Sequence, residues 1–289
     1  MADEDAKEKE KRMEEELSSL LKDLNLNIRR NPAAVSAKLD TAFMNKCEDD
    51  FDKFCDEFTT MKGQAASKRD RETAEDPVYK SADYTYTEIE FKTIAVVIEK
   101  IRKVYGVPNV ACSGLSGVLQ HKGGFFYDLG SGQGKTVIAA SLLHEFDSCI
   151  GIEYLGSLVV AASDVERSYQ TTKKQVSQII ADRDFDTHIS MLFGDFMDFS
   201  TCKDWTNGDV VFVNSTSFVD ATMEKIAELA AGMRRGSFVV TMSKRLPSPL
   251  FTLLDYGMYP VSFGQATVYI QQKMVSGRKL DESDSDDDD

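Results

Sequence analysis

Apolar residues in the second half of the chain come in short runs that alternate with longer amphipathic stretches. The short runs predict five strands, at Phe125–Asp128, Cys149–Ile152, Ile189–Phe193, Asp209–Val213 and Ser237–Met242. The stretches between them predict helices at Lys135–Phe146, Leu158–Ile180 and Ala221–Met233. This alternation is typical of an α/β doubly wound domain. The segment Tyr256–Gln272 is then expected to supply closing antiparallel strands.

The N-terminal part of the chain shows helical spacing instead. Apolar residues form one stripe along residues 4–24, and aromatic and cysteine side chains recur every three or four positions from Val35 to Met61. A further helix is predicted at Glu88–Val104. The polar segment Gly63–Pro77 is expected to be a linker, and the glycine- and serine-rich segment Gly106–Gly124 a loop.

Charge is distributed unevenly along the 289 residues. Of the net charge of −14, half lies in Asp281–Asp289, which carries seven acids and no base. Such a run cannot be buried, so we expect a disordered tail that keeps the chain soluble or contacts a basic partner such as a histone. The most basic stretch, Lys68–Arg71, is short and interrupted by an acid, which argues against strong autonomous DNA binding.

Composition excludes several other classes of protein. No apolar run approaches the roughly 18 residues that a membrane span requires, so no contact with a membrane is expected. The five cysteines include no Cys-x-x-Cys pair, which favours a reducing compartment and argues against a structural zinc site. The three histidines are isolated and show no metal-ligand spacing, so we expect no metal centre.

The clearest chemical signal is the glycine-rich turn after the first predicted strand. Residues 128–134 read Asp-Leu-Gly-Ser-Gly-Gln-Gly, and Glu153 follows the second strand, nineteen residues beyond the last glycine. Glycines let the backbone approach a nucleotide closely, and an acid at the tip of the second strand can hold ribose hydroxyls. Dinucleotide sites use Gly-x-Gly-x-x-Gly, whereas Asp-x-Gly-x-Gly-x-Gly is common in methyltransferases that use S-adenosylmethionine (SAM).

An ATP site is the weaker interpretation of the same loop. Gly134-Lys135-Thr136 looks like the end of a Walker A loop, but the glycine which that motif requires at position 129 is Leu129. The fourth predicted strand also ends in Asn214 and not in an acid that could hold magnesium.

Two further segments follow strands at the same edge of the predicted sheet. In Gly194-Asp195-Phe196, the acid could accept from the adenine amino group and the ring could stack on adenine. The alternative is a capping acid beside a core aromatic. Phe212-Val213-Asn214-Ser215 ends the fourth strand, where ligands bind in open α/β sheets.

Together these segments resemble the histone lysine methyltransferases of the disruptor-of-telomeric-silencing type, which are Rossmann-fold enzymes without a SET domain. The glycine loop resembles the family's Asp-Leu-Gly-Ser-Gly-Val-Gly, and Gly151–Glu153 resembles its Gly-Val-Glu. Gly194–Phe196 matches its Gly-Asp-Phe, and Val211–Ser215 resembles its Phe-Val-Asn-Asn strand end. Upstream, Tyr86–Phe91 resembles the Tyr-Gly-Glu-Thr-x-Phe loop that covers the cofactor, and downstream Ser243-Lys244 resembles its Ser-Lys-Pro.

The resemblance, which covers about residues 80–250, implies a fold, a cofactor and a substrate. It implies a Rossmann-like class I SAM methyltransferase sheet at residues 77–275, after an N-terminal helical region and linker at 1–76 and before a disordered acidic tail at 276–289. The cofactor would be S-adenosyl-L-methionine, and the substrate a lysine on the core surface of histone H3, in the nucleosome or as free histone. The expected location is the nucleus, with the cytoplasm as the alternative.

The resemblance also implies roles for particular residues. Tyr86, Phe212 and Asn214 would be the catalytic residues and line the lysine channel. No side chain stands out as a general base, so we expect the lysine to lose its proton to solvent. Cofactor contacts would come from Tyr86, Thr87, Glu88, Asp128, Gly130, Ser131, Gly132, Gly134, Glu153, Asp195, Phe196 and Asn214.

The chain also departs from the family pattern. Thr87 stands in place of the family's glycine, Ile89 in place of its threonine and Ser215 in place of its second asparagine. The family's basic nucleosome-binding extension has no equivalent. Two alternatives therefore stay open: a SAM-dependent methyltransferase of a non-histone protein or small molecule, and a non-catalytic SAM-binding scaffold. The glycine loop and Asn214 argue against the scaffold.

Overall fold

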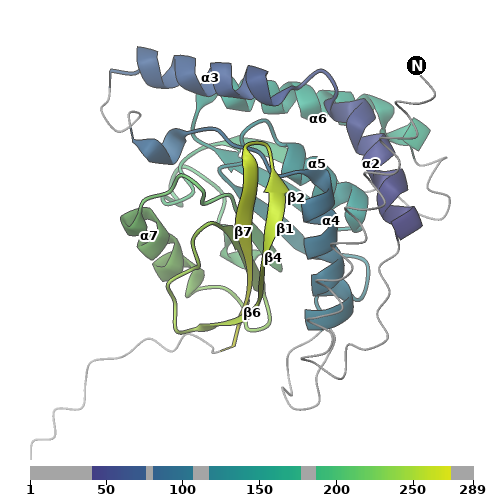
Figure 1. The fold of residues 1–289 in the computed structure, drawn as a ribbon, viewed down its shortest axis with the longest axis vertical. Helices are drawn as coiled ribbons and strands as arrows, with labels where there is room; N and C mark the ends of the chain where they lie inside the picture. The colour runs from purple at the N-terminus through teal and green to yellow at the C-terminus, as the bar shows by residue number, and fades with distance from the viewer. Residues whose placement is uncertain (1–40, 76–80, 107–116, 177–186, 275–289) are drawn as a thin grey trace, which may run out of the picture.

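A seven-stranded mixed sheet forms the centre of the computed structural model, which describes residues 41–75, 81–106, 117–176 and 187–274 (Figure 1). The strand order is β3-β2-β1-β4-β5-β7-β6. The first five strands are parallel: β1 (Phe125–Leu129), β2 (Ser148–Glu153), β3 (His188–Phe193), β4 (Val210–Val213) and β5 (Phe238–Met242). The last two, β6 (Phe251–Val261) and β7 (Gly264–Lys273), form an antiparallel hairpin at one edge. The sequence-based prediction of an α/β fold with closing antiparallel strands is confirmed.

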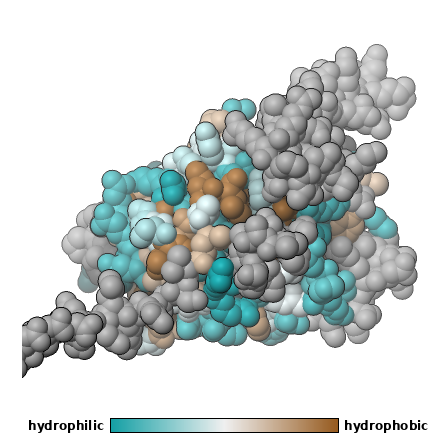
Figure 2. Space-filling view, turned by 90° about the horizontal axis from the view of Figure 1, so that it is seen from below, coloured by the Kyte–Doolittle hydropathy of each residue, from teal (hydrophilic) through white to brown (hydrophobic). Residues whose placement is uncertain are grey.

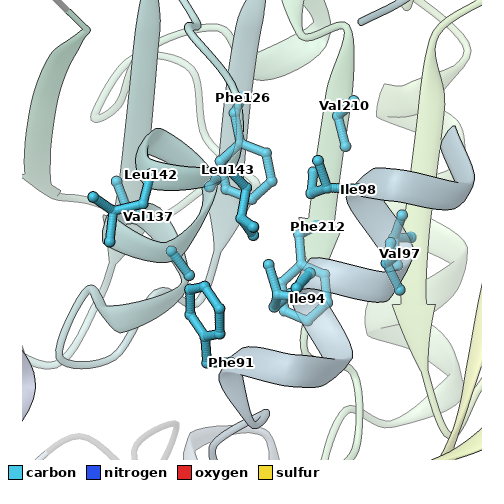
Figure 3. Close-up of a cluster of buried hydrophobic side chains, with 14 of the residues drawn as sticks. Phe91, Ile94, Val97, Ile98, Phe126, Val137, Leu142, Leu143, Val210 and Phe212 are labelled. Carbon is cyan, nitrogen blue, oxygen red and sulfur yellow. The ribbon is translucent and has the colours of Figure 1, made fainter. Parts of the chain in front are cut away.

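Helices cover both faces of the sheet. Successive residues of a strand point to opposite faces, and in the central parallel strands the residues on both faces are mostly buried. The helix α7 (Asp220–Ala230) packs on one face, against a core that includes Tyr127, Val211 and Trp205. The other face is covered by α4 (Phe91–Lys100), α5 (Lys135–Leu143), α6 (Gly156–Val176) and α2 (Thr41–Cys55). Figure 3 shows this second core, where Ile94 and Ile98 of α4 approach Phe126, Val210 and Phe212.

The N-terminal helices differ from the sequence-based expectation. The helix predicted to run to Met61 ends at Cys55, and the predicted linker Gly63–Pro77 is wrong over most of its length, because α3 spans Thr60–Thr73. Thr59 caps α3 by accepting a hydrogen bond from the Lys62 N–H at 3.4 Å. The buried side of α3 consists of Gly63 and Ser67, so the helix has no apolar stripe that a periodicity argument could detect.

Several predicted segments lie outside the described residues. They are the helix at residues 4–24, the start of the helix predicted from Val35, most of the loop Gly106–Gly124 and the acidic tail at 276–289. The predicted strands and the helices α5, α6 and α7 are found at the expected positions, with ends that differ by a few residues. The predicted end of the helix Leu158–Ile180 lies outside the described residues.

A buried ion pair fastens the hairpin to the helical layer. The predicted helix Glu88–Val104 begins at Phe91 and changes at Ile101 into a π-helical turn. Just before this turn, Lys100 Nζ donates to Asp255 Oδ2 at 2.7 Å and to the Tyr259 hydroxyl at 2.6 Å. Burial works against the charge of Lys100, but these two partners raise its pKa above the usual value.

The surface of the molecule carries both hydrophobic and hydrophilic residues (Figure 2). In the view from below, hydrophobic residues lie together near the middle of the face, with hydrophilic residues beside them (Figure 2). In the part of the chain that the structure describes, no helix is long and apolar enough to cross a membrane.

Candidate cofactor and active site

Two adjoining pockets open at the carboxyl ends of the parallel strands. The larger, of about 70 Å³, is lined by Glu153, Asp195 and Phe196 among others. The smaller, of about 20 Å³, is lined by Glu88, Asp128, Ser131, Gly132 and Phe212 among others. Both share the four residues Tyr86, Thr87, Gly130 and Asn214. Of the residues predicted for the site, only Gly134 lines neither pocket.

The glycine loop brings its backbone close to the covering segment, residues 83–90, which directly precedes α4. Gly132 has φ +56°, in the left-handed region, and a Cβ placed on it would lie 2.4 Å from a ring carbon of Tyr86. Gly134 has φ +78° as well, and a Cβ there would lie 2.5 Å from Met191 Cε of β3. The structure therefore gives Gly134 a packing role, at the point where α5 approaches the sheet.

Glu153 is held rigidly where β2 ends. Its Oε2 accepts from the Gly132 N–H, and its Oε1 accepts from the N–H groups of Tyr154 and Leu155, all at 2.8 Å. Burial raises its pKa, while these three donors act in the opposite direction. The carboxylate links the second strand to the glycine loop and lines the larger pocket.

Asp128 supplies the polar group at the base of the smaller pocket. The side chain is 2% exposed, and its Oδ1 has no hydrogen-bond partner among the described residues. Burial and the nearby Glu153 raise its pKa to about 8, against a smaller opposing effect of Thr136. A buried carboxyl oxygen without a partner is costly, and a cationic group of a ligand would satisfy it. SAM carries such a group, the ammonium of its methionine moiety, so the residues present fit this cofactor.

Aromatic side chains form much of the larger pocket. The rings of Tyr84 and Tyr154 lie 5.7 Å apart, and those of Phe196 and Phe218 lie 5.8 Å apart. Asp195 Oδ1 accepts from the Met197 N–H at 2.8 Å, so this acid caps its own turn while it lines the pocket. Aromatic walls beside a carboxylate suit a purine ring.

The covering segment is tied to the end of β4. Asn214 Nδ2 donates to the Thr87 carbonyl at 2.9 Å and to Thr87 Oγ1 at 3.1 Å. The Tyr86 hydroxyl donates to Glu88, and burial together with the Glu88 carboxylate raises the Tyr86 pKa well above its usual value. The structure thus brings together the three residues Tyr86, Phe212 and Asn214 around the smaller pocket.

Sequence reasoning missed several residues that build the site. Asp83 accepts from the Val219 N–H at 2.6 Å and from Thr222 Oγ1 at 2.9 Å, which fastens the covering segment to the start of α7. Lys135 lines the smaller pocket, although its only sequence signal was the discarded Walker-like ending. Tyr154 could have been found, because it directly follows the ribose-type acid Glu153.

Comparison with known proteins identifies the family. The sequence model of the family described as histone methylation protein DOT1 matches residues 99–254, which is more than half of the chain. The chain belongs to the DOT1 family. Its sheet has the Rossmann-like class I methyltransferase fold, and the cofactor of this fold and family is SAM.

Solved structures similar to this DOT1-family chain include a tRNA methyltransferase. The tRNA methyltransferase TrmK of B. subtilis has 15% identity and a TM-score of 0.40, with 64% of this chain and 66% of that chain covered. TrmN from Thermus thermophilus has 12% identity and a TM-score of 0.43, with 64% and 52% covered. No curated protein matches the sequence.

Replacing Asp128 with Asn is expected to make the stability of the ligand-free protein less dependent on pH. Because folding raises the pKa of Asp128 from 3.8 to about 8, its contribution is fully present below the unfolded pKa and is lost as pH rises through about 8. The wild type should therefore lose stability as pH rises from about 4 to about 8, and the amide variant should lose less. Thermal unfolding over this range measures the difference, and equal slopes for both proteins would contradict it.

Proposed function

We propose that this DOT1-family chain transfers a methyl group from SAM to a lysine on the core surface of histone H3. The observation that carries the proposal is the convergence of Tyr86, Phe212 and Asn214 on the smaller pocket, beside the glycine loop. These are the residues to which the family resemblance assigns catalysis. The family's description as a histone methylation protein supports the substrate, and with it a nuclear location and the nucleosome as partner.

The chemistry requires an oriented, neutral amine. When bound, the cofactor supplies a methyl group on a positively charged sulfur. A lysine ammonium has no lone pair and must lose its proton before attack. Phe212, which is 2% exposed, offers an apolar wall that would lower the lysine pKa by removing water. Asn214 and Thr87 hold the covering segment in place, so that the amine can approach in line.

We infer that the proton passes to solvent. Among the described residues, no histidine lines either pocket. The Glu88 carboxylate is bonded to Tyr86 and lies 2.9 Å from Lys135 Nζ, so it is already engaged. A pH–rate profile with a steep dependence on one protein side chain, abolished by changing that side chain, would contradict this mechanism.

The charge of the pockets favours a cationic substrate. The acids Asp83, Glu88, Glu153 and Asp195 line them, against the single base Lys135 among the described residues. Asp128 also lines the smaller pocket, but its raised pKa of about 8 leaves it largely protonated at neutral pH in the ligand-free protein. A negative potential at the site attracts both a sulfonium and a lysine ammonium.

Net charge favours a second candidate function, methylation of a non-histone protein or a small molecule. The whole chain carries a net charge of −14, and nucleosomal DNA would repel it. The acidic run at residues 281–289 could instead contact basic histone surfaces, which would reconcile the net charge with the first candidate.

The test is transfer of labelled methyl from SAM to nucleosomes, free histones and a total cell extract in parallel. We expect label on histone H3 within nucleosomes and none with Gly132→Arg, because that side chain would collide with Tyr86. Label only on another protein of the extract would keep the activity and overturn the substrate. Cofactor binding without transfer to any of the three would contradict the proposed activity.

A further inference from the structure

Lys135 and Thr136 of the Walker-like ending both line the smaller pocket, and Lys135 is the charged one. It is the first residue of α5 and lines the smaller pocket, with a side chain that is 17% exposed. It is also the single cationic side chain among the described residues that line either pocket. Its Nζ lies 2.9 Å from Glu88 Oε1 and 3.0 Å from Glu88 Oε2.

We propose that Lys135 binds the α-carboxylate of the cofactor's methionine moiety and makes the site selective for cofactors that carry this group. The inference rests on SAM as cofactor and does not depend on which substrate is methylated. It assigns a cofactor contact to a residue outside the set that the sequence predicted.

The position of Lys135 calls for an anion. A cation in the first turn of a helix opposes the helix dipole, and a half-buried ammonium loses part of its hydration. The residue that caps α5, Gly134, has no side chain that could accept a hydrogen bond from the first turn of the helix. The free N–H groups of the first turn and the Lys135 ammonium therefore favour the same kind of ligand group.

A second observation shows that a ligand is expected at this place. Asp128 Oδ1 and Ser131 Oγ are both without a hydrogen-bond partner among the described residues, and both side chains are at least nine-tenths buried in the wall of the same pocket. The lining of the pocket therefore holds a carboxyl oxygen without a partner, at Asp128, and a cation, at Lys135. An amino-acid zwitterion, with its ammonium and carboxylate, matches both.

Glu88 does not prevent this contact. Its carboxylate also accepts hydrogen bonds from Tyr86 and from Thr60 Oγ1, so it keeps partners when Lys135 turns toward a ligand. The Lys135 ammonium has three N–H donors, and Glu88 takes two of them. One donor and much of the charge remain for the carboxylate.

The experiment compares SAM with decarboxylated SAM, which keeps the sulfonium and the ammonium and lacks only the carboxylate. Equilibrium binding is measured by calorimetry for the wild type, Lys135→Met and Lys135→Gln. We expect Lys135→Met to weaken SAM binding about ten- to hundredfold and decarboxylated SAM less than about threefold, because only SAM offers the anion. Lys135→Gln keeps hydrogen-bond donors and should lose less than Lys135→Met.

Lys225→Met, on the exposed side of α7, is the matched control and should leave both affinities unchanged. Equal weakening of both ligands, or no weakening of either, would overturn the proposal and leave Lys135 as a structural partner of Glu88. If the wild type binds neither SAM nor decarboxylated SAM, both the proposal for Lys135 and the cofactor site are overturned. If both ligands bind as expected but histone H3 is not methylated, the proposal for Lys135 holds and the proposed function fails.

Discussion

Replacing Gly132 with alanine is expected to lower cofactor affinity about a hundredfold while the sheet remains folded. A Cβ at this position would lie 2.4 Å from the Tyr86 ring, and the backbone has φ +56°, which costs an L-residue roughly 1–2 kcal/mol. The ring cannot simply retreat, because Gly63 of α3 supports its other side, where an added Cβ would lie 2.2 Å away. The substitution must therefore displace the covering segment or the glycine loop, and both line the two pockets.

Calorimetric titration with SAM and thermal unfolding measure the two parts of this prediction. Gly156→Ala is the matched control, because Gly156 begins α6 and has no heavy atom within 4 Å of an added Cβ. We expect its cofactor affinity and unfolding temperature to equal those of the wild type. If Gly132→Ala binds SAM as the wild type does, Tyr86 does not have to rest on the loop for the cofactor to bind.

The glycine loop could be found from the sequence because its information is local. A strand, an acid, three alternating glycines and a helix follow one another within twenty residues, and the second acid lies at the tip of the next strand. Parallel neighbours then place their carboxyl ends at one edge of the sheet by geometry alone, since β1 pairs with both β2 and β4. This is why Asp128, Glu153 and Asn214 were all expected there.

Contacts between distant segments could not be found in this way. The carboxylate of Glu88 meets Thr60 of α3 and Lys135 of α5, which lie 28 and 47 positions away in the sequence. Each of these polar residues is unremarkable in its own segment. The role of Lys135 depends on a tertiary contact that neither hydrophobic periodicity nor motif spacing encodes.

Helix α3 shows the same limit for secondary structure. It buries small and polar residues, so its packing depends on close approach and on hydrogen bonds such as that from Ser67 Oγ to the Tyr84 carbonyl at 2.7 Å. Asp70 extends this side of the helix and accepts from the Ser157 N–H at 2.7 Å, near the start of α6. A helix held by polar contacts has the composition of a linker, and here it supports the covering segment of the site.

Replacing Asn214 with alanine is expected to lower kcat about a hundredfold with little change in the unfolding temperature. The change removes the hydrogen bonds from Nδ2 to the Thr87 carbonyl and to Thr87 Oγ1, which join the end of β4 to the covering segment at the seam of the two pockets. We propose that this junction orients the reacting amine, and loss of one positioned polar group at a reacting centre typically costs about 10²- to 10³-fold in kcat. The Asn214 side chain is only partly buried, so its loss leaves no large cavity.

Single-turnover methyl transfer at saturating SAM, together with SAM titration, separates the rate from the affinity. Asn207→Ala is the matched control, since Asn207 is exposed and precedes the opposite end of β4. Its side-chain amide donates to the Asp204 carbonyl within its own turn. It should transfer methyl groups at the wild-type rate. A variant at Asn214 that loses affinity for SAM but keeps the wild-type rate once saturated would place this residue in cofactor binding alone. An unchanged rate and affinity would remove it from the site altogether. A fall in the rate at saturation would place Asn214 beside the reacting atoms, where the end of β4 and the covering segment meet.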